Sequence, residues 1–488
     1  MQAIGFHNTD NPQVTPTPWT KDYRQGATIF GEQTFLPIDY HQARNDNTLV
    51  VGSSGTGKTY SFVEPNVLSA NANYVVADAK GDILADTGMS LRAQGYQLQV
   101  LNLVDLKHSQ TYNPLHYMHD QLDVVAFAHQ VIGADITGND DHRSFDDPFW
   151  TNAPATLLEA LIMFTKEFLP TAEQTMGTVT RLFELIDRTD EDVNAVLASL
   201  GYSAATQYAF DHDQDEYGNA LPVSLGERLF AWVAGEKPDS VALRLWNSVA
   251  RSKGSEKTWS SIVGILGTAL SPYMVADVDN LLASNQLDFA RLLQPKAALF
   301  VLYDDADPAK NFLANVLYNQ LFSFLYHHAF HQPAGRLPIK VRFFLDDFKN
   351  IQVPHFDDYL ATARSWNLSL CMMVQDESQL RGLSDDGDDR PDDGQGCGRP
   401  LQPRRPLGAT TFLVDVSGHL TATRRYDFHD HPNYRPGKLA VAATYQTPRA
   451  ATNREALVQI LQQLPGEHPV TRGDEAVDLF DGLDDLPM

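Results

Sequence analysis

The chain has 488 residues and a mass of 54.3 kDa, with 43% hydrophobic and 20% charged residues. This composition is typical of a globular protein with a sizeable core, and it excludes a wholly disordered chain, a collagen and a small disulfide scaffold. Lys and Arg number 37 and Asp and Glu 62, so the net charge of −25 excludes a protein that coats nucleic acid through general basicity; any DNA contact needs a local basic surface.

The apolar pattern predicts a parallel α/β sheet that is interrupted by a helical insertion. Residues 1–45 form a polar, Pro-rich N-terminal extension that becomes partly strand-like in ATIFGEQTFLPI. Residues 46–121 contain a strand, a Gly-rich turn and a helix, followed by strands in NYVVADAKGD and YQLQVLNLVD. Residues 122–249 have apolar residues at helical spacing, as in APATLLEALIMFTKEFL and EDVNAVLASL, and predict an all-α domain. Strands return within residues 250–383 at KAALFVLYD, KVRFFLDD and LSLCMMVQ, which is the alternation of a parallel sheet.

The composition of the two ends of the chain and its cysteine content indicate in which cell compartment we expect the protein. Residues 384–488 form a diverged region, rich in Asp, Gly and Pro, with an acidic tail, which is the composition of loops. The N-terminus has neither a basic nor an apolar leader segment, and Cys371 and Cys397 are too few for a disulfide framework. We therefore expect a cytoplasmic protein. Because anionic lipids repel an acidic chain, we expect it to reach the cytoplasmic face of the cell membrane only through partner proteins.

The strongest motif is a phosphate-binding loop (a Walker A motif) between a predicted strand and a predicted helix. It reads G-x-x-x-x-G-K-T and consists of Gly52, Ser53, Ser54, Gly55, Thr56, Gly57, Lys58 and Thr59. Glycines let backbone N–H groups turn inward around a phosphate, and the following helix adds the positive end of its dipole. Lys58 would neutralise the β- and γ-phosphates of ATP, and the Thr59 hydroxyl would bind Mg²⁺.

A second group of candidate residues follows later strands. Asp346 and Asp347 end an apolar run, and the carboxyl ends of parallel strands are where such sheets bind ligands. We expect Asp346 to complete the Mg²⁺ shell and Asp347 to orient or deprotonate the attacking water. A helical crossover then leads to another strand, so Gln375 should lie at the same edge and could sense the γ-phosphate. Arg364 is a candidate arginine finger toward a neighbouring subunit. Each assignment has an alternative. Asp346 and Asp347 could form a solvated acidic turn, Gln375 could be a simple polar residue at a strand end, and Arg364 could be an ordinary surface charge.

These motifs, in this order, resemble the type IV secretion coupling proteins, the conjugative-transfer ATPases that present DNA to a secretion channel. The resemblance runs from about residue 47 to residue 383 and includes GKTYSFVEPNVL, NYVVADAKGDILADTG, YNPLHY, DPFW, KTWSSIVG and RFFLDDFKNIQVPHF. It implies a RecA-like P-loop NTPase sheet interrupted by an all-α domain, with ATP and Mg²⁺ as cofactors, in a homo-hexameric ring. Carried onto matching positions, the resemblance implies that Lys58 and Thr59 bind the nucleotide and that Asp346 binds the metal. It also implies that Arg364 is the arginine finger that acts on a neighbouring subunit and that Gln375 is the family's coupling glutamine.

The sequence departs from the family's pattern in four places. The N-terminal membrane anchor of many members is not seen, which predicts a soluble or truncated variant. The usual Asp-Glu pair is Asp346-Asp347, and Asp82 stands where Glu usually follows the K-G pair. After Leu383 the final stretch of the RecA-like core is not recognisable, as in a diverged end or a chain whose reading frame has changed.

We therefore expect an ATP-driven coupling protein. It would recruit a relaxase or another substrate protein to the components of a type IV secretion channel, and it would pump single- or double-stranded DNA. Two alternatives remain open. One is another ring-forming DNA translocase or helicase. The other is a nucleotide-binding docking adaptor with little ATPase activity, which Asp347 and the unrecognised C-terminal region favour. A metal site in HDHPNY, residues 429–434, is a weaker hypothesis because clustered His in a loop is usually solvated.

Overall fold

The computed structural model describes residues 26–32, 34–38, 45–133, 147–188, 213–214, 220–221, 224–304, 308–346, 353–354, 356–375, 411–416, 419–448, 454–462 and 464. The chain divides into two compact units. The first combines Met1–Asp146 with Ser271–Ala451, and the second combines Asp147–Leu270 with Thr452–Met488.

These limits differ from the predicted all-α domain at residues 122–249. Helix α3 (Gln121–Gly133) belongs to the first unit, where its Gln130 accepts a hydrogen bond of 3.0 Å from Asn319 of α11 (Asn311–Phe330). Helix α9 (Glu256–Leu270) belongs to the second unit, where its Trp259 ring meets the Trp246 ring of α8 (Val241–Ala250). Periodicity identified the helices but could not tell which unit each one packs against.

A six-stranded sheet forms the centre of the first unit, and all of its neighbouring strands pair in parallel. Three strands precede the second unit and three follow it, which confirms the predicted α/β class and its interrupted sheet. The order is β3 (Thr48–Val51), β10 (Leu368–Val374), β9 (Val341–Leu345), β4 (Asn73–Ala79), β8 (Ala297–Tyr303) and β5 (Gln97–Asn102).

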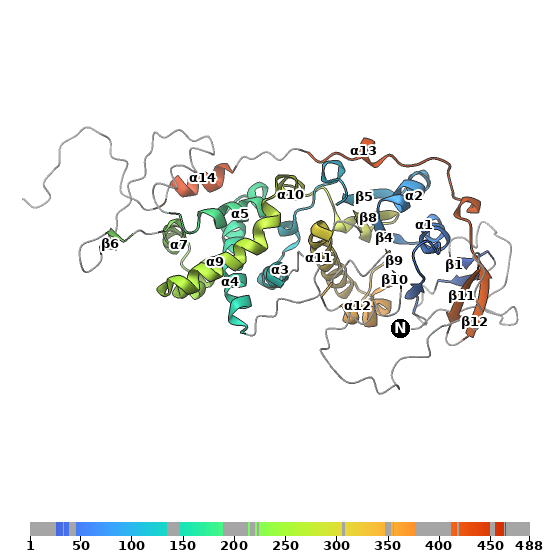
Figure 1. Ribbon diagram of the computed structural model, residues 1–488, viewed down its shortest axis with the longest axis horizontal. Helices are drawn as coiled ribbons and strands as arrows, with labels where there is room; N and C mark the ends of the chain where they lie inside the picture. The colour runs from blue at the N-terminus through green and yellow to red at the C-terminus, as the bar shows by residue number, and fades with distance from the viewer. Residues whose placement is uncertain are drawn as a thin grey trace, which may run out of the picture. The chain divides into compact units, whose positions relative to one another are not determined.

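Helices cover both faces of this sheet, which is why its strands are apolar along most of their length. Helices α1 (Glu64–Leu68) and α2 (Asp82–Ala93) lie on one side, and α11 and α12 (Phe356–Thr362) lie on the other (Figure 1). Phe343 and Phe344 are consecutive in β9 and therefore point to opposite faces. The Phe343 ring stacks on Phe322 of α11 with 4.7 Å between centroids, whereas the Phe344 ring lies 6.3 Å from Phe62.

The second unit is mainly helical in its described part. Its aromatic core stacks Phe230 on Trp246 at 4.5 Å, and Lys253 lies 5.4 Å and 5.0 Å from the rings of Trp246 and Trp259. Glu173 accepts hydrogen bonds from the first backbone N–H groups of its last helix, where a carboxylate is favoured. The remaining elements are α4 (Phe149–Phe168), α5 (Met176–Leu185), β6 (Asp213–Gln214), β7 (Ala220–Leu221), α7 (Leu225–Glu236) and α14 (Glu455–Gln462). The predicted helix EDVNAVLASL lies outside the described residues.

Two hairpins flank the first unit's sheet: β1 (Ala27–Gly31) with β2 (Thr34–Pro37), and β11 (Thr411–Val416) with β12 (His419–Arg424). The predicted strand character near ATIFGEQTFLPI is thus confirmed. The hairpins meet where the Glu32 N–H donates to the Arg424 carbonyl at 3.1 Å.

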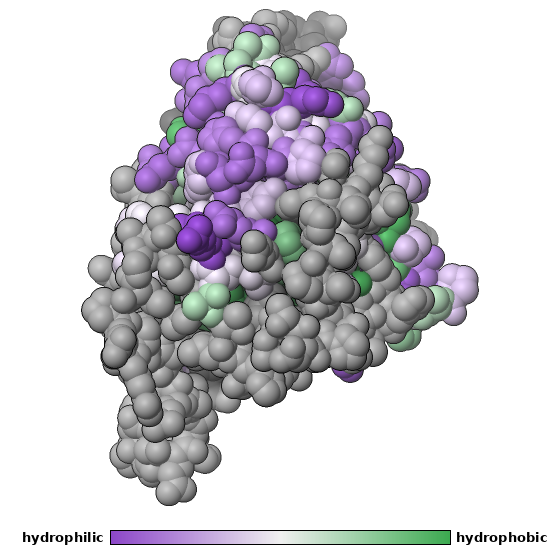
Figure 2. Space-filling view, turned by 90° about the vertical axis from the view of Figure 1, so that its right-hand side faces the viewer, coloured by the Kyte–Doolittle hydropathy of each residue, from purple (hydrophilic) through white to green (hydrophobic). Residues whose placement is uncertain are grey.

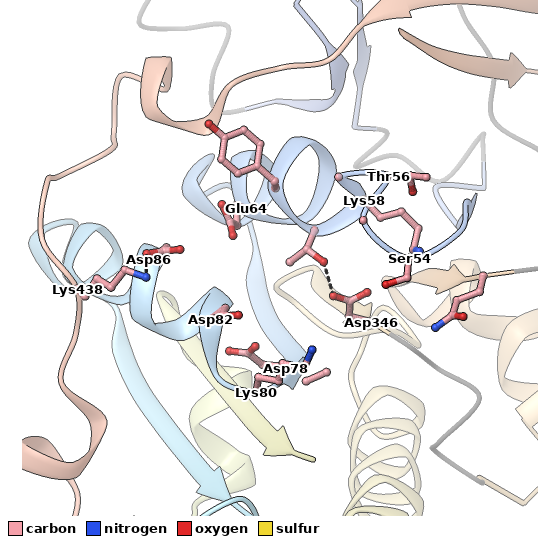
Figure 3. Close-up of a pocket in the computed structure, with 16 residues that line it drawn as sticks. Ser54, Thr56, Lys58, Glu64, Asp78, Lys80, Asp82, Asp86, Asp346 and Lys438 are labelled. Atoms are coloured by element: carbon pink, nitrogen blue, oxygen red, sulfur yellow. Dashed lines mark hydrogen bonds and ion pairs between the residues drawn. The ribbon is translucent and has the colours of Figure 1, made fainter. Parts of the chain in front are cut away.

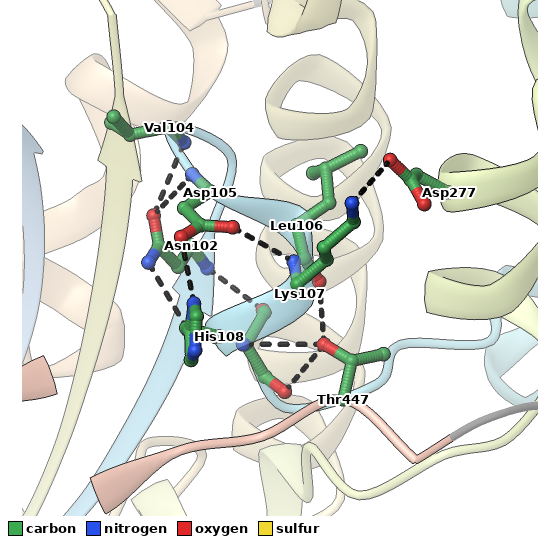
Figure 4. A network of polar contacts seen from close by, with 9 residues as sticks. Asn102, Val104, Asp105, Leu106, Lys107, His108, Asp277 and Thr447 are labelled. Atoms are coloured by element: carbon green, nitrogen blue, oxygen red, sulfur yellow. Dashed lines mark hydrogen bonds and ion pairs between the residues drawn. The ribbon is translucent and has the colours of Figure 1, made fainter. Parts of the chain in front are cut away.

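After β12, the C-terminal segment (Arg425–Thr447, including α13, Val441–Thr444) packs across the first unit. Its Leu439 N–H donates to the Ala85 carbonyl of α2 at 2.9 Å. At its end the Thr447 hydroxyl donates to the Leu106 carbonyl and the Thr447 N–H to the Lys107 carbonyl, beside α10 (Ala276–Leu282) (Figure 4). The region that could not be recognised from sequence therefore contributes to this unit, although its described part adds no strand to the parallel sheet.

The described surface is mainly polar. On the face in Figure 2, hydrophilic side chains dominate and hydrophobic ones form small, separate groups where residues are described. Among the described residues, no single helix is long and apolar enough to cross a membrane; Glu256–Met274 and Ala276–Leu282 satisfy that requirement only as a bent pair.

A buried ion pair joins the starts of β3 and β9, and it gives a test of the fold. The side chains of Lys340 and Asp46 are 5% and 6% exposed. Because Lys340→Met leaves the Asp46 carboxylate buried without this cation, we expect the free energy of unfolding to fall by about 3–5 kcal/mol in urea titrations. The double variant Asp46→Leu with Lys340→Met should recover part of that loss. Equal stability of wild type and Lys340→Met would contradict the pairing.

Candidate functional site

The phosphate-binding loop connects β3 to a helix that starts as one wide, π-helical turn (Thr59–Val63) and continues as α1. Gly55 and Gly57 have φ values of +75° and +81°, which only glycine adopts without strain. A Cβ on Gly52 would lie 2.7 Å from the Thr56 hydroxyl oxygen, so this position also has no room for a side chain. The Thr56 hydroxyl donates to the Ser53 carbonyl at 2.7 Å and closes the loop.

Lys58 lies inside this loop and is 8% exposed. Its ammonium donates to the carbonyl of Gly52, and to that of Ser53 at 3.3 Å. The helix that follows directs its unsatisfied N–H groups and its positive dipole end to the same place. The loop is therefore built to hold a group with several negative oxygens.

Thr59 and Asp346 meet beside the loop. The Thr59 hydroxyl donates to Asp346 Oδ2 at 2.6 Å (Figure 3). Strand β10 lies between β3 and β9 and pairs in register with both, so the ends of the three strands reach one edge. A hydroxyl next to a carboxylate is a donor set that suits a hard divalent cation such as Mg²⁺. Asp347, the second acid predicted here, lies outside the described residues.

A pocket of about 480 Å³ opens at this edge. The structure brings most of the sequence-predicted residues together in it: Ser54, Gly55, Thr56, Gly57, Lys58, Thr59, Asp346 and Gln375. Gly52 and Ser53 form the base of the loop, where the Gly52 N–H donates to the Val374 carbonyl of β10 at 3.1 Å. That bond places Gln375, the next residue, beside the loop.

Arg364 lies away from this pocket. It is exposed, and it belongs to a short 3₁₀ turn (Ala363–Trp366) that comes just before β10. The pocket lies at the other end of β10, after its last residue. Because β10 has 7 residues and a strand rises about 3.3 Å per residue, its two ends are about 20 Å apart. Arg364 therefore cannot reach the pocket of its own subunit.

Sequence reasoning did not assign Asp78, which is the next-to-last residue of β4 and lines the pocket. Its carboxylate is fully buried and accepts hydrogen bonds from the N–H groups of Ile83 (3.2 Å) and Leu84 (2.8 Å). Burial raises the pKa of Asp78 to about 7. The signal was present, because the apolar run YVVA comes directly before Asp78, much as a mostly apolar run comes directly before Asp346. Lys80, two residues later, has a φ of +85°, an unusual backbone conformation for a residue with a side chain.

Glu64 is the second unassigned acid in the pocket, and no sequence signal indicated it. The side chain is 4% exposed, and among the described residues no hydrogen-bond partner lies near its Oε2 atom. Burial, followed by the negative charges of Asp86, Asp78 and Asp82, raises the pKa of Glu64 to about 8. At neutral pH most of this carboxyl is protonated.

The C-terminal segment also reaches the pocket. Lys438 lines it and forms an ion pair of 3.3 Å with Asp86 of α2 (Figure 3). The other unassigned lining residues are Tyr60, Ala79, Lys80, Asp82 and Asp86. The hypothesis of a metal site at residues 429–434 finds no support, because the described part of the chain contains no group of three or more His, Cys, Asp or Glu side chains arranged for a metal ion.

A family model described as type IV secretory system conjugative DNA transfer matches residues 9–391. No curated protein sequence matches the chain.

The chain is similar to three solved structures of a bacterial conjugative coupling protein, TrwB. An unbound form is 16% identical with a TM-score of 0.46, covering 73% of this chain and 67% of that chain. A complex with the non-hydrolysable ATP analogue ADPNP is 16% identical with a TM-score of 0.45, covering 73% and 69%. A complex with ADP and Mg²⁺ is 16% identical with a TM-score of 0.43, covering 71% and 68%.

The raised pKa of Glu64 makes stability depend on pH. The fold favours its protonated form, so this contribution is complete below the pKa of about 4.5 in the unfolded chain and is lost as the pH rises through about 8. Relative to Glu64→Gln, the wild-type free energy of unfolding should therefore fall between pH 5 and pH 9. The total fall should be about 1.4 kcal/mol for each unit by which the pKa of Glu64 in the folded protein exceeds that in the unfolded chain. Urea titrations across this range measure the effect. Glu236→Gln, on the exposed surface of α7, is the control, and parallel pH curves for wild type and Glu64→Gln would contradict the assignment.

Proposed function

Because the chain belongs to the type IV secretory system conjugative DNA transfer family, as its motifs predict, we propose that it is an ATP-driven coupling protein. In this proposal it recruits a relaxase–DNA substrate to a type IV secretion channel and pumps the DNA during conjugative transfer. The observation that carries the enzymatic part is the convergence of Lys58, Thr59, Asp346 and Gln375 in one pocket.

The donor set fits ATP as substrate and Mg²⁺ as cofactor. The loop's N–H groups and the Lys58 ammonium would bind the β- and γ-phosphates, and the oxygens of Thr59 and Asp346 would hold the metal ion. Bound Mg²⁺ supplies neutralisation of the charge that develops on the phosphate oxygens. The geometry supports this assignment because the two oxygens are already 2.6 Å apart and both residues line the pocket.

The chain's own polar residues would act on the water that attacks the γ-phosphate. Asp347 follows Asp346 directly, and we assign it to orient that water or accept its proton. Gln375 lines the pocket at the end of β10 and would report the presence of the γ-phosphate to that strand. Asp78, with a pKa raised to about 7, is a further carboxyl in the pocket within the range that suits a proton acceptor at neutral pH.

Arg364 enters the proposal through a ring of subunits. Its exposed position, about 20 Å along β10 from the pocket of its own subunit, suits contact with the nucleotide of a neighbour. We therefore propose a homo-hexamer in which Arg364 acts in trans. We also propose a cytoplasmic location, with partner proteins holding the acidic chain near the membrane, and DNA contact through a local basic surface.

A docking adaptor that binds nucleotide without much turnover is the second candidate. The shorter acid at position 347 favours it, because Asp does not extend as far toward the water as the usual Glu. The adaptor predicts relaxase binding without DNA-stimulated ATP hydrolysis, which separates it from the motor.

The first test is ATP hydrolysis by purified protein with and without single-stranded DNA. We expect a DNA-stimulated rate in wild type, and a reduction of about a hundredfold or more in Lys58→Ala because phosphate neutralisation is lost. Lys107→Ala, whose side chain is 73% exposed, is the matched control and should keep the wild-type rate. Near-normal turnover in Lys58→Ala would overturn the site, and DNA-independent trace activity in wild type would favour the adaptor.

The trans role of Arg364 is tested by mixing subunits. Arg364→Ala alone should lose about a thousandfold or more of the hydrolysis rate, as expected for an arginine finger. When it is mixed with wild type before assembly, the rate should fall well below the wild-type share of the mixture. Arg244→Ala, another exposed arginine, is the control. A rate that simply follows the wild-type fraction would argue against action in trans.

A further inference from the structure

An aromatic wall stands beside the phosphate-binding loop. It consists of Tyr60, which follows Thr59 directly, and of Phe428, His429 and Tyr434 from the C-terminal segment. The Tyr60 ring meets Phe428 edge-on, with 4.8 Å between centroids and 81° between planes, and lies 5.8 Å from His429. Tyr434 closes the group at 5.4 Å from Phe428 and 4.9 Å from His429.

Hydrogen bonds fix the orientation of Tyr60. Its hydroxyl donates to Asp427 Oδ1 at 2.6 Å and lies 3.0 Å from His429 Nδ1. The hydroxyl is thus engaged by the C-terminal segment, whereas 39% of the residue stays exposed. A ring held in one orientation before binding loses less conformational freedom when a ligand packs against it.

The C-terminal segment is itself fastened to the helices around the loop. The Asn433 side chain donates to the Leu68 carbonyl of α1 at 2.8 Å, and the Arg435 N–H donates to the Ser90 hydroxyl of α2 at 2.8 Å. The guanidinium of Arg425 approaches Gly57 so closely that a Cβ there would lie 3.2 Å from it. The wall is therefore fixed relative to the loop rather than being a loose surface feature.

We propose that the aromatic wall is the nucleoside-binding part of the pocket, and that the base of the bound nucleotide stacks on Tyr60. The inference deepens the proposed function, because it presumes that a nucleotide's phosphates occupy the loop. Among the described residues that line the pocket, Tyr60 is the one aromatic side chain, and it is adjacent in sequence to Thr59. Bases have flat apolar faces that stack on aromatic rings without regard to base identity, so the wall should accept nucleotides with different bases.

The rival explanation is that these rings only attach the C-terminal segment to the first unit. The two explanations differ in one measurable respect. A nucleoside-binding wall affects ligands that carry a base and leaves tripolyphosphate, which has none, unaffected. A purely structural contact affects both ligands equally through the shape of the loop.

The experiment is isothermal titration of the full chain with Mg·ATP and with Mg·tripolyphosphate, in wild type, Tyr60→Ala and Tyr60→Phe. Wild type should bind ATP more tightly than tripolyphosphate. Tyr60→Ala should weaken ATP about tenfold or more, which is the loss expected when one base loses its stacking partner, and keep the Kd of tripolyphosphate within about twofold. Tyr60→Phe keeps the ring and should bind ATP with a Kd close to that of wild type.

Three results would overturn the inference. The first is unchanged ATP affinity in Tyr60→Ala, and the second is an equal loss of affinity for ATP and tripolyphosphate in that variant. The third is a Tyr60→Phe variant as weak as Tyr60→Ala, which would assign the effect to the hydroxyl. Lys58→Ala separates the two proposals, because it should lose both ligands. A wild-type protein that binds neither ligand would overturn the proposed function and this inference with it.

Discussion

The hydrogen bond from Thr59 to Asp346, 2.6 Å long, holds the site together. Thr59 belongs to the part of the chain before the second unit and Asp346 to the part after it. The bond can form because β10 and β9 enter the sheet between β3 and β4, which brings the carboxyl ends of strands from both parts to one edge. Asp346 is further held where the Tyr303 hydroxyl donates to its carbonyl. The second unit can therefore be inserted in the sequence without interrupting the site in space.

Sequence alone predicted the residues whose position follows from a local rule. The phosphate-binding loop is a continuous motif, and Asp346 and Gln375 follow apolar strands whose carboxyl ends must share an edge. Asp78 obeys the same rule, but the order of the strands decides whether it lies near the loop, and sequence does not give that order. β4 lies directly beside β9, with Ala77 opposite Leu345, so the residues that follow are neighbours. The role of Arg364 stays a prediction because it depends on a neighbouring subunit.

Residues that depend on tertiary packing had no sequence signal. Glu64 occupies an ordinary position near a helix start, and only the packing of α1 against α2 buries it beside other acids. Lys438 lies in a region whose composition resembles a loop. That region nevertheless buries Leu439 and Tyr445 in the core of the first unit, at a few places separated by polar residues. Such widely spaced anchors produce neither a period of 2 nor one of 3.6, so pattern reasoning could not detect them.

Acid groups in the pocket create an electrostatic problem for a ligand with several negative charges. Five acids and three lysines line it among the residues that the structure describes: Glu64, Asp78, Asp82, Asp86, Asp346, Lys58, Lys80 and Lys438. Two features reduce the repulsion. Lys438 is paired with Asp86, and burial raises the pKa of Glu64 to about 8 and that of Asp78 to about 7, so both carboxyls are largely or partly neutral at pH 7. A divalent cation at Thr59 and Asp346 would neutralise more of the charge. The same burial that makes these carboxyls costly to ionise therefore makes the pocket acceptable to a polyphosphate at neutral pH, and less so as the pH rises through the pKa of Glu64.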